Sequence, residues 1–249
     1  PYNEGLDGAT IHYGATLVPN GWHQKNGNWY FGRNGKLVTG WQNIDGHYYY
    51  FGEDHAMATY WQDINGNRYY FSGDGTMDTG WVLHEEEYYY MGADGIMLSG
   101  WQDIGESRYH FDTDGTMDTG WCQWEDQFYY LGDDGSMQQG WLEIDGQRYH
   151  FRESGAMDTG YVIMDGQTYR FDADGSMVTG WVEEGEYRYY LKEDGTMAVS
   201  PTEIDGKTYY FTPKGVHLWL VNPWIELHED YEVELVEVVA GYRIAAVCE

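Results

Sequence analysis

Large apolar side chains recur along most of the chain at an interval of 20 residues, except for one interval of 19 between Trp22 and Trp41. Tryptophan forms the first column, in which Tyr161 fills one gap: Trp22, Trp41, Trp61, Trp81, Trp101, Trp121, Trp141 and Trp181. The second column is aromatic or aliphatic: Phe31, Phe51, Phe71, Met91, Phe111, Leu131, Phe151, Phe171, Leu191 and Phe211. The third column is methionine: Met57, Met77, Met97, Met117, Met137, Met157, Met177 and Met197. A fixed short period is typical of repeat proteins, in which each unit packs on its neighbours.

Each unit has the pattern of two short strands joined by a tight turn. Dipeptides such as Asn65-Gly66 and Asp45-Gly46 accept the positive φ that a two-residue hairpin turn requires. The flanking residues predict strands near Trp41 to Ile44 and Tyr48 to Phe51, repeated through the array. A single hairpin is marginal in water, so we expect successive hairpins to stack. The expected fold is all-β, an elongated solenoid of stacked β-hairpin repeats of about 20 residues.

The periodicity also sets the expected domain limits. Residues 1–20 lead into the array, and the hairpin repeats cover residues 21–218. From residue 219 the period stops and the composition changes, so residues 219–249 are expected to be a linker and the beginning of a truncated second domain.

Strand alternation divides the second strand of each unit into two faces. The residue two before the second column, in a series that starts at Trp29 and continues with Tyr49, shares that column's face and is expected in the core. The residues one and three before the column share a face with the Trp. At the third position two residue types alternate, apart from Thr168: Tyr48, Arg68, Tyr88, Arg108, Phe128, Arg148, Arg188. Either the Arg units differ in ligand binding, or each Arg stem only covers an aromatic face.

These units resemble the choline-binding or cell-wall-binding repeats of Gram-positive surface proteins, phage lysins and clostridial toxins. The resemblance rests on GW, an IDG-like turn, YYF and DGxMxTG, and it covers residues 21–218. It implies cages in which the Trp, an aromatic of the second strand and an aromatic of the next hairpin surround a quaternary ammonium by cation–π attraction. The ligand-binding residues it implies are Trp41, Tyr48 and Tyr70; Trp81, Tyr88 and His110; and Trp121, Phe128 and His150. His110 and His150 depart from the aromatic pattern of the family.

The arginine units suggest a limit on the number of such sites. A guanidinium at Arg68, Arg108, Arg148 or Arg188 would lie near the Trp of its own unit and fill the cage. We therefore expect a cationic ligand only in the alternate, aromatic units.

The residues after the array resemble the beginning of a VanY-type D-alanyl-D-alanine carboxypeptidase. The resemblance covers Leu220 to Tyr231 and Gly241 to Arg243, and the zinc-binding motifs of that family would follow beyond Glu249. It implies a parent enzyme that trims peptidoglycan. For the chain itself we expect no catalytic residues, no metal site and no cofactor.

Composition narrows the possible partners. The 13 Lys and Arg against 42 Asp and Glu give a net charge of −29, which opposes binding to nucleic acid. No apolar run is long enough for a membrane span. We therefore expect a secreted, cell-wall-associated module that binds choline, or a similar substituent, on teichoic acid. The alternative is a carbohydrate-binding array for α-glucan or host glycan, in which the same rings would stack on sugars.

Overall fold

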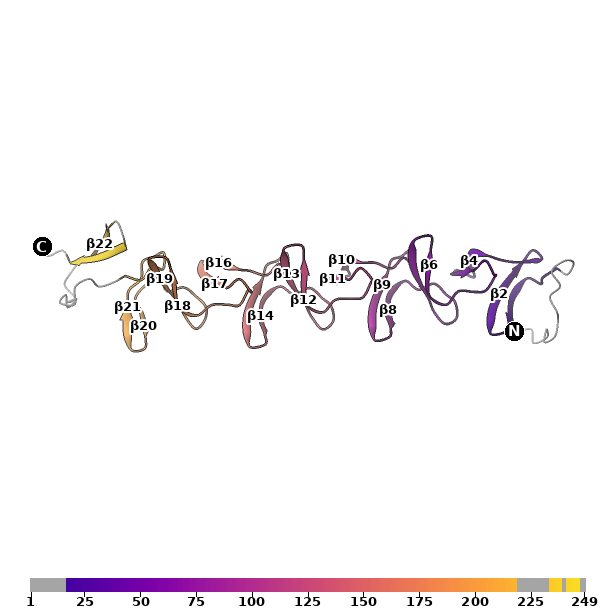
Figure 1. Cartoon of the computed structure of the whole chain (residues 1–249), viewed down its shortest axis with the longest axis horizontal. Helices are drawn as coiled ribbons and strands as arrows, with labels where there is room; N and C mark the ends of the chain where they lie inside the picture. The colour runs from indigo at the N-terminus through magenta and orange to yellow at the C-terminus, as the bar shows by residue number, and fades with distance from the viewer. Residues whose placement is uncertain (1–16, 219–232, 239–240, 247–249) are drawn as a thin grey trace. The chain divides into compact units, whose positions relative to one another are not determined.

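The computed structural model describes residues 17–218, together with the backbone of two strands at 233–238 and 241–246. Contacts within the chain define two units, residues 1–119 with 133–136, and residues 120–132 with 137–249. Each unit is a series of β-hairpins, seen as paired arrows in Figure 1. All regular elements in these described ranges are strands, which confirms the all-β prediction.

The first unit contains five hairpins, the first of which has a short third strand. Its strands are β1 (Gly21–Lys25), β2 (Asn28–Arg33), β3 (Lys36–Leu37), β4 (Gly40–Ile44), β5 (His47–Phe51), β6 (Tyr60–Ile64), β7 (Asn67–Phe71), β8 (Gly80–His84), β9 (Glu87–Met91), β10 (Gly100–Ile104) and β11 (Ser107–Phe111). The strands predicted near Trp41 to Ile44 and Tyr48 to Phe51 are thus confirmed as β4 and β5.

The second unit continues the series with five hairpins of the same kind and one further hairpin. Its strands are β12 (Gly120–Trp124), β13 (Gln127–Leu131), β14 (Gly140–Ile144), β15 (Gln147–Phe151), β16 (Gly160–Met164), β17 (Gln167–Phe171), β18 (Gly180–Glu184), β19 (Tyr187–Leu191), β20 (Thr202–Ile204), β21 (Lys207–Tyr209), β22 (Val233–Val238) and β23 (Gly241–Ala246).

The hairpin turns follow the chemistry that their sequences predict. In the β6–β7 turn, Asn65 and Gly66 have φ of 53° and 83°. Both values lie in the left-handed region, which asparagine and glycine tolerate best. The β8–β9 turn has the same conformation with two glutamates, Glu85 and Glu86, at φ of 51° and 71°. Side chains with a Cβ are strained in that region, so this turn is held by the hairpin around it.

Stacking, rather than strand pairing, joins successive hairpins. Beyond the third strand of the first hairpin, each described hairpin is its own two-stranded sheet. The second-column side chains Phe51, Phe71, Met91 and Phe111 in the first unit are almost completely buried. The methionine that follows each hairpin reaches back along the stack: the Met77 N–H donates to the Tyr48 carbonyl at 2.8 Å. The expected columns of Phe or Leu and Met are therefore confirmed within each unit.

The first hairpin differs from the prediction because its repeat has 19 residues. The alignment on Phe31 was wrong: β1 pairs Gly21 with Gly32, whereas β4 pairs Gly40 with Phe51. Gly32 therefore holds the buried second-column position. A Cβ there would lie 2.0 Å from the Pro19 carbonyl oxygen, so the backbone before β1 replaces the missing side chain.

The expected roles of residues 1–20 and 219–249 remain predictions. In the described part of the leading segment, the Val18 N–H donates to the Gly35 carbonyl at 3.1 Å. Strands β22 and β23 form an antiparallel hairpin with Val233 opposite Ala246. Most other residues that carry the carboxypeptidase resemblance lie outside the described residues. In the part of the chain that the structure describes, no helix has the length and apolarity needed to cross a membrane.

Candidate ligand-binding grooves

The tryptophan of each hairpin lies on a face that it shares with alternate residues of the second strand. In β8–β9 the register places Trp81 opposite Tyr90 and Leu83 opposite Tyr88, so these four side chains project from one face. The ring of Trp81 lies 5.1 Å from Tyr90 and 6.3 Å from Tyr88, both edge to face. This confirms that the residues one and three before the second column share the surface of the Trp.

The opposite face of the next hairpin completes the groove. Tyr109 and Phe111 of β11 lie 5.0 and 5.8 Å from the Trp81 ring. The same arrangement recurs at Trp41, which lies 4.9 Å from Tyr69, and at Trp121, which lies 5.0 Å from Tyr149. Each groove thus combines a Trp, the aromatic three before the second column, and a Tyr from the next hairpin.

Each predicted cage had three members. The structure brings the first two together as predicted, but it places the third elsewhere. Trp41 with Tyr48, Trp81 with Tyr88 and Trp121 with Phe128 lie on common faces. The expected third members project from the other face of the next hairpin, against its own tryptophan: Tyr70 lies 4.9 Å from Trp61, His110 5.0 Å from Trp101, and His150 5.0 Å from Trp141. Ligand binding by the nine residues stays a prediction.

The third members were predicted wrongly because side chains alternate between the two faces of a strand. The face that meets the preceding Trp carries the second-column residue and the residue two before it, so Tyr69, Tyr109 and Tyr149 replace Tyr70, His110 and His150 as third members. All three replacements are tyrosines. The departure from the family pattern at His110 and His150 therefore does not affect these grooves.

The two histidines belong to polar clusters that they form with an aspartate from the segment after their own hairpin. His110 Nδ1 lies 2.5 Å from Asp118 Oδ2, and His150 Nδ1 lies 2.7 Å from Asp158 Oδ2. Asp158, which is 1% exposed, also accepts a hydrogen bond of 2.6 Å from Arg152 Nε. The hydrogen bond with His150 and the charge of Arg152 offset the cost of burying this carboxylate.

A fourth aromatic groove lies at the first hairpin, where the 19-residue repeat hid it. Trp29, which the sequence alignment placed in the core series, stands three before Gly32 and lies 6.3 Å from Trp22 at an interplanar angle of 88°. The Trp81–Tyr88 pair has the same distance and angle. Tyr49 of the next hairpin lies 5.0 Å from Trp22. The shortened interval between Trp22 and Trp41 was the signal that could have revealed this groove.

The turn that follows most hairpins carries an aspartate, and two of these, Asp74 and Asp174, act on the Tyr residues of the grooves. Burial raises the pKa of Tyr149, and the negative charge of Asp174 raises it further. Tyr49 is affected in the same way by burial and by Asp74. Hydrogen bonds from Ser176 lower the pKa of Asp174, so this carboxylate is charged at neutral pH. The grooves therefore combine aromatic faces with a negative charge, which favours a cationic ligand.

In four other hairpins an arginine takes the place of the second aromatic. The guanidinium carbon lies over the Trp of the same hairpin at 4.7 Å for Arg68, 5.1 Å for Arg108, 4.7 Å for Arg148 and 4.0 Å for Arg188. The predicted contact between each arginine and its own Trp is confirmed.

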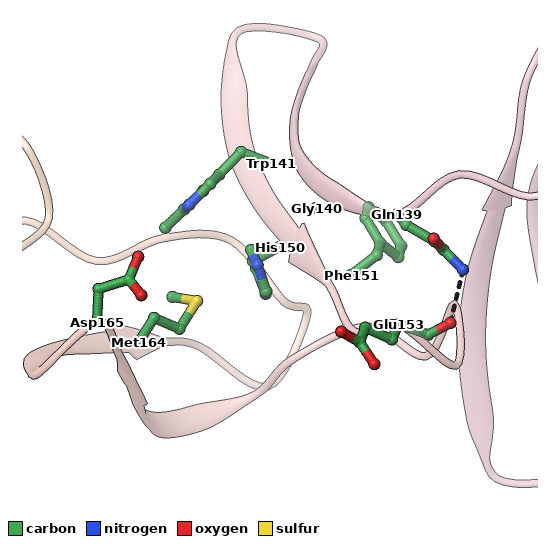
Figure 2. Close-up of a pocket in the computed structure, with 8 residues that line it drawn as sticks. All are labelled: Gln139, Gly140, Trp141, His150, Phe151, Glu153, Met164 and Asp165. Atoms are coloured by element: carbon green, nitrogen blue, oxygen red, sulfur yellow. Dashed lines mark hydrogen bonds between the residues drawn. The ribbon is translucent and has the colours of Figure 1, made fainter.

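An open groove with a volume of about 630 Å³ lies beside one of these hairpins, and its lining residues are drawn in Figure 2. Trp141 and His150 line one side, and Met164 with Asp165 from the next hairpin line the other. At the right of the picture, Gln139 Nε2 donates to the Glu153 carbonyl at 2.6 Å. In β6–β7 the position of Gly140 is held by Tyr60, whose ring lies 6.2 Å from Tyr70. The groove at Trp141 is open because glycine leaves that space free.

Comparison with known proteins agrees with this geometry. The family model of the choline-binding repeat matches residues 58–99, 98–138 and 159–201, and a model of a cell-wall-binding repeat matches residues 39–54 and 139–157. The solved structure of CbpJ from Streptococcus pneumoniae TIGR4 is 31% identical, covers 80% of each chain and has a TM-score of 0.70. The chain belongs to the choline-binding repeat family.

Two further solved structures from Streptococcus pneumoniae show the same architecture. Choline binding protein F is 26% identical over 86% of this chain and 90% of its own, with a TM-score of 0.63. The choline-binding domain of CbpL is 29% identical over 72% of this chain and 97% of its own, with a TM-score of 0.56. Choline binding protein F has also been solved in the presence of a peptidoglycan analogue, a tetrasaccharide-pentapeptide. No curated protein sequence matches the chain.

Proposed function

We propose that the array is a non-catalytic cell-wall-binding module that recognises choline, or a similar quaternary ammonium substituent, on teichoic acid. The observation that carries this proposal is the repeated exposed aromatic pair. In the four aromatic hairpins the Trp side chains are 36–43% exposed: Trp22, Trp41, Trp81 and Trp121. Beside them Tyr48, Tyr88 and Phe128 are exposed as well. Exposed aromatic side chains that repeat at one position of a stack are typical of a binding surface.

The chemistry of the grooves favours a methylated cation. Trp, Tyr and Phe faces attract an ammonium group through their quadrupoles, and they also contact its methyl groups without requiring hydrogen bonds. Each such contact contributes about 0.5–2 kcal/mol, so several rings around one cation reach the millimolar range. Asp74 and Asp174 add an attraction that salt weakens.

Several grooves along one chain suit a repetitive polymer. A ligand of millimolar affinity at each groove becomes strongly retained when a polymer presents many copies, because the later contacts form within one complex. We therefore propose a secreted, cell-wall-associated protein that is held by several weak contacts at once.

The deciding experiment compares retention of the 249-residue chain on immobilised choline, amylose and dextran. We expect retention on choline and elution by free choline, with Trp81→Ala and Trp121→Ala together weakening it. Retention on amylose or dextran with elution by free glucan would instead support the alternative, an α-glucan or host-glycan array. Passage through all three columns contradicts both functions.

We further propose that the module delivers a D-alanyl-D-alanine carboxypeptidase to the wall. Support comes from the sequence resemblance of the residues after the array. The test is D-alanine release from wall peptides by the protein at its natural length, with the 249-residue chain as the control. Zinc-dependent release by the natural protein, and none by the 249-residue chain, is the expected result. The absence of zinc-dependent release from both samples contradicts the proposal.

A further inference from the structure

We infer that the four arginine hairpins are cages already occupied by a cation of the chain itself, so that Arg68, Arg108, Arg148 and Arg188 decide which repeats accept a quaternary ammonium ligand. This inference rests on the proposed function. Three features of the arginine hairpins carry it: the position of the guanidinium, its acidic partner and the exposure of the tryptophan.

The guanidinium occupies the place that a ligand cation would take. Arg68 lies over Trp61, and Tyr89 of the next hairpin lies 4.8 Å from the same indole. Burial and Asp114 raise the pKa of Tyr89, while the charge of Arg68 opposes them. Hydrogen bonds from Thr116 lower the pKa of Asp114, and Arg68 adds to the lowering. Arg68 thus lies over the Trp of its groove, and its charge acts on the Tyr and the Asp of the same groove.

Each arginine has an acidic residue directly across the hairpin, in contrast to the aromatic units. Strand register pairs Asp63 with Arg68, Asp103 with Arg108, Glu143 with Arg148, and Glu183 with Arg188. The ion pairs are 3.6 Å for Arg108–Asp103 and 3.5 Å for Arg188–Glu183. In the aromatic hairpins the same position holds a neutral residue: Asn43, Leu83, Gln123. In the hairpins of Arg108 and Arg188 this acid helps to hold the guanidinium over the ring.

The tryptophans differ in exposure as this arrangement requires. The tryptophans of the aromatic hairpins are exposed. The tryptophans of the arginine hairpins are less accessible, each being partly buried: Trp61, Trp101, Trp141 and Trp181. Among the described residues, Arg68 Nε is buried and has no hydrogen-bond partner. Its neighbour is therefore the indole face, which fits a cation–π contact better than a hydrogen-bonded surface arginine.

A tethered cation has an advantage over a free one. Its effective concentration at the ring is set by the chain, whereas free choline must bear the cost of association and also displace the arginine. The aromatic hairpins should therefore bind the ligand, while the Trp of each arginine hairpin stays covered by its own guanidinium.

The test is calorimetric titration of the 249-residue chain with choline chloride. We expect four sites in the unaltered chain, at Trp22, Trp41, Trp81 and Trp121, and five in either Arg68→Tyr or Arg148→Tyr. Tyrosine is the natural residue at this position of β5 and β9, so these variants should fold, which circular dichroism can verify. Arg68→Lys should retain four sites, because the lysine keeps a tethered cation.

Arg170→Tyr is the matched control. Arg170 also lies over an aromatic ring, Tyr161, at 5.7 Å, but it stands one before the second column, and its hairpin has Thr168 in the cage position. We expect the Arg170→Tyr variant to bind choline at four sites, as the unaltered chain does. A crystal of Arg68→Tyr grown in choline should show the ligand on Trp61.

The outcomes separate the two proposals. Five sites in Arg68→Tyr beside four in Arg170→Tyr support the inference. An unchanged number in Arg68→Tyr, or choline on Trp61 of the unaltered chain, overturns it and leaves the proposed function intact. A chain that binds no choline at any groove overturns the proposed function and the inference together.

Discussion

Hairpins β6–β7 and β8–β9 are neighbours in one unit and share a backbone, yet they present different surfaces. Both have a Trp, a two-residue turn of positive φ and a buried second-column residue, Phe71 or Met91. The first covers its Trp with Arg68, whereas the second leaves Trp81 beside the exposed Tyr88. A repeat fold can therefore vary its binding surface through two cross-strand positions, since neither contributes to the stacked core.

The polar clusters of the arginine hairpins should give the largest difference in stability. We expect Asp158→Ala to destabilise the protein by about 3 kcal/mol, because His150 and Arg152 both lose the buried carboxylate with which they form hydrogen bonds. Urea unfolding measures this change. Combining Asp158→Leu, Arg152→Gly and His150→Tyr, which reproduces Leu98, Gly92 and Tyr90 of β8–β9, should recover most of the loss. No recovery would mean that the cluster has a role beyond charge compensation.

Replacing tryptophans tests whether the two kinds of hairpin differ in binding. Trp81→Ala should reduce the choline sites from four to three, and Trp61→Ala should leave four. Both should destabilise the stack by about 2 kcal/mol, less than for a fully buried Trp because each ring is only partly buried. Titration and thermal unfolding on the same samples give both values. A site lost in Trp61→Ala would contradict the distinction.

The turns of the same two hairpins offer a smaller effect. Exchanging Glu85 and Glu86 for the Asn-Gly of the β6–β7 turn should stabilise the protein by about 1 kcal/mol, because it removes two strained left-handed side chains. The reverse exchange at Asn65 and Gly66 should lose a similar amount. Thermal unfolding measures both, and choline binding should not change. A loss of stability in the first variant would show that the glutamates make compensating contacts.

The smallest effect concerns His217, which replaces the column methionine at the last arginine hairpin. Burial lowers its pKa, and Arg188 lowers it further. The folded protein therefore holds the neutral form, so its contribution to stability is complete above the unfolded-state pKa of about 6.5 and is lost as the pH falls below it. In His217→Met, the free energy of unfolding should change less between pH 7 and pH 5 than it does in the unaltered protein. An equal pH dependence in both proteins would show that His217 does not contribute to it.

Local signals decided most of the fold. The turn dipeptides and the recurrent aromatic columns specify hairpins every 20 residues, and alternation along a strand separates the Trp face from the second-column face. The arginine at every other unit also predicted its contact with the neighbouring Trp, since both side chains belong to one hairpin. These features depend on residues close in sequence, where spacing alone fixes geometry.

Contacts between hairpins required the tertiary structure. The choice of Tyr109 rather than His110 beside Trp81 depends on which face the next hairpin turns towards that ring, and a shift of one residue reverses the answer. The position of Trp29 likewise depended on Gly32. Because glycine has no side chain, the sequence does not mark Gly32 as a member of the second column. The structure does, because the Pro19 backbone fills the space of the missing side chain. Periodicity determined the hairpins, while stacking across hairpins decided which side chains meet, because no local backbone rule relates residues that touch only through packing.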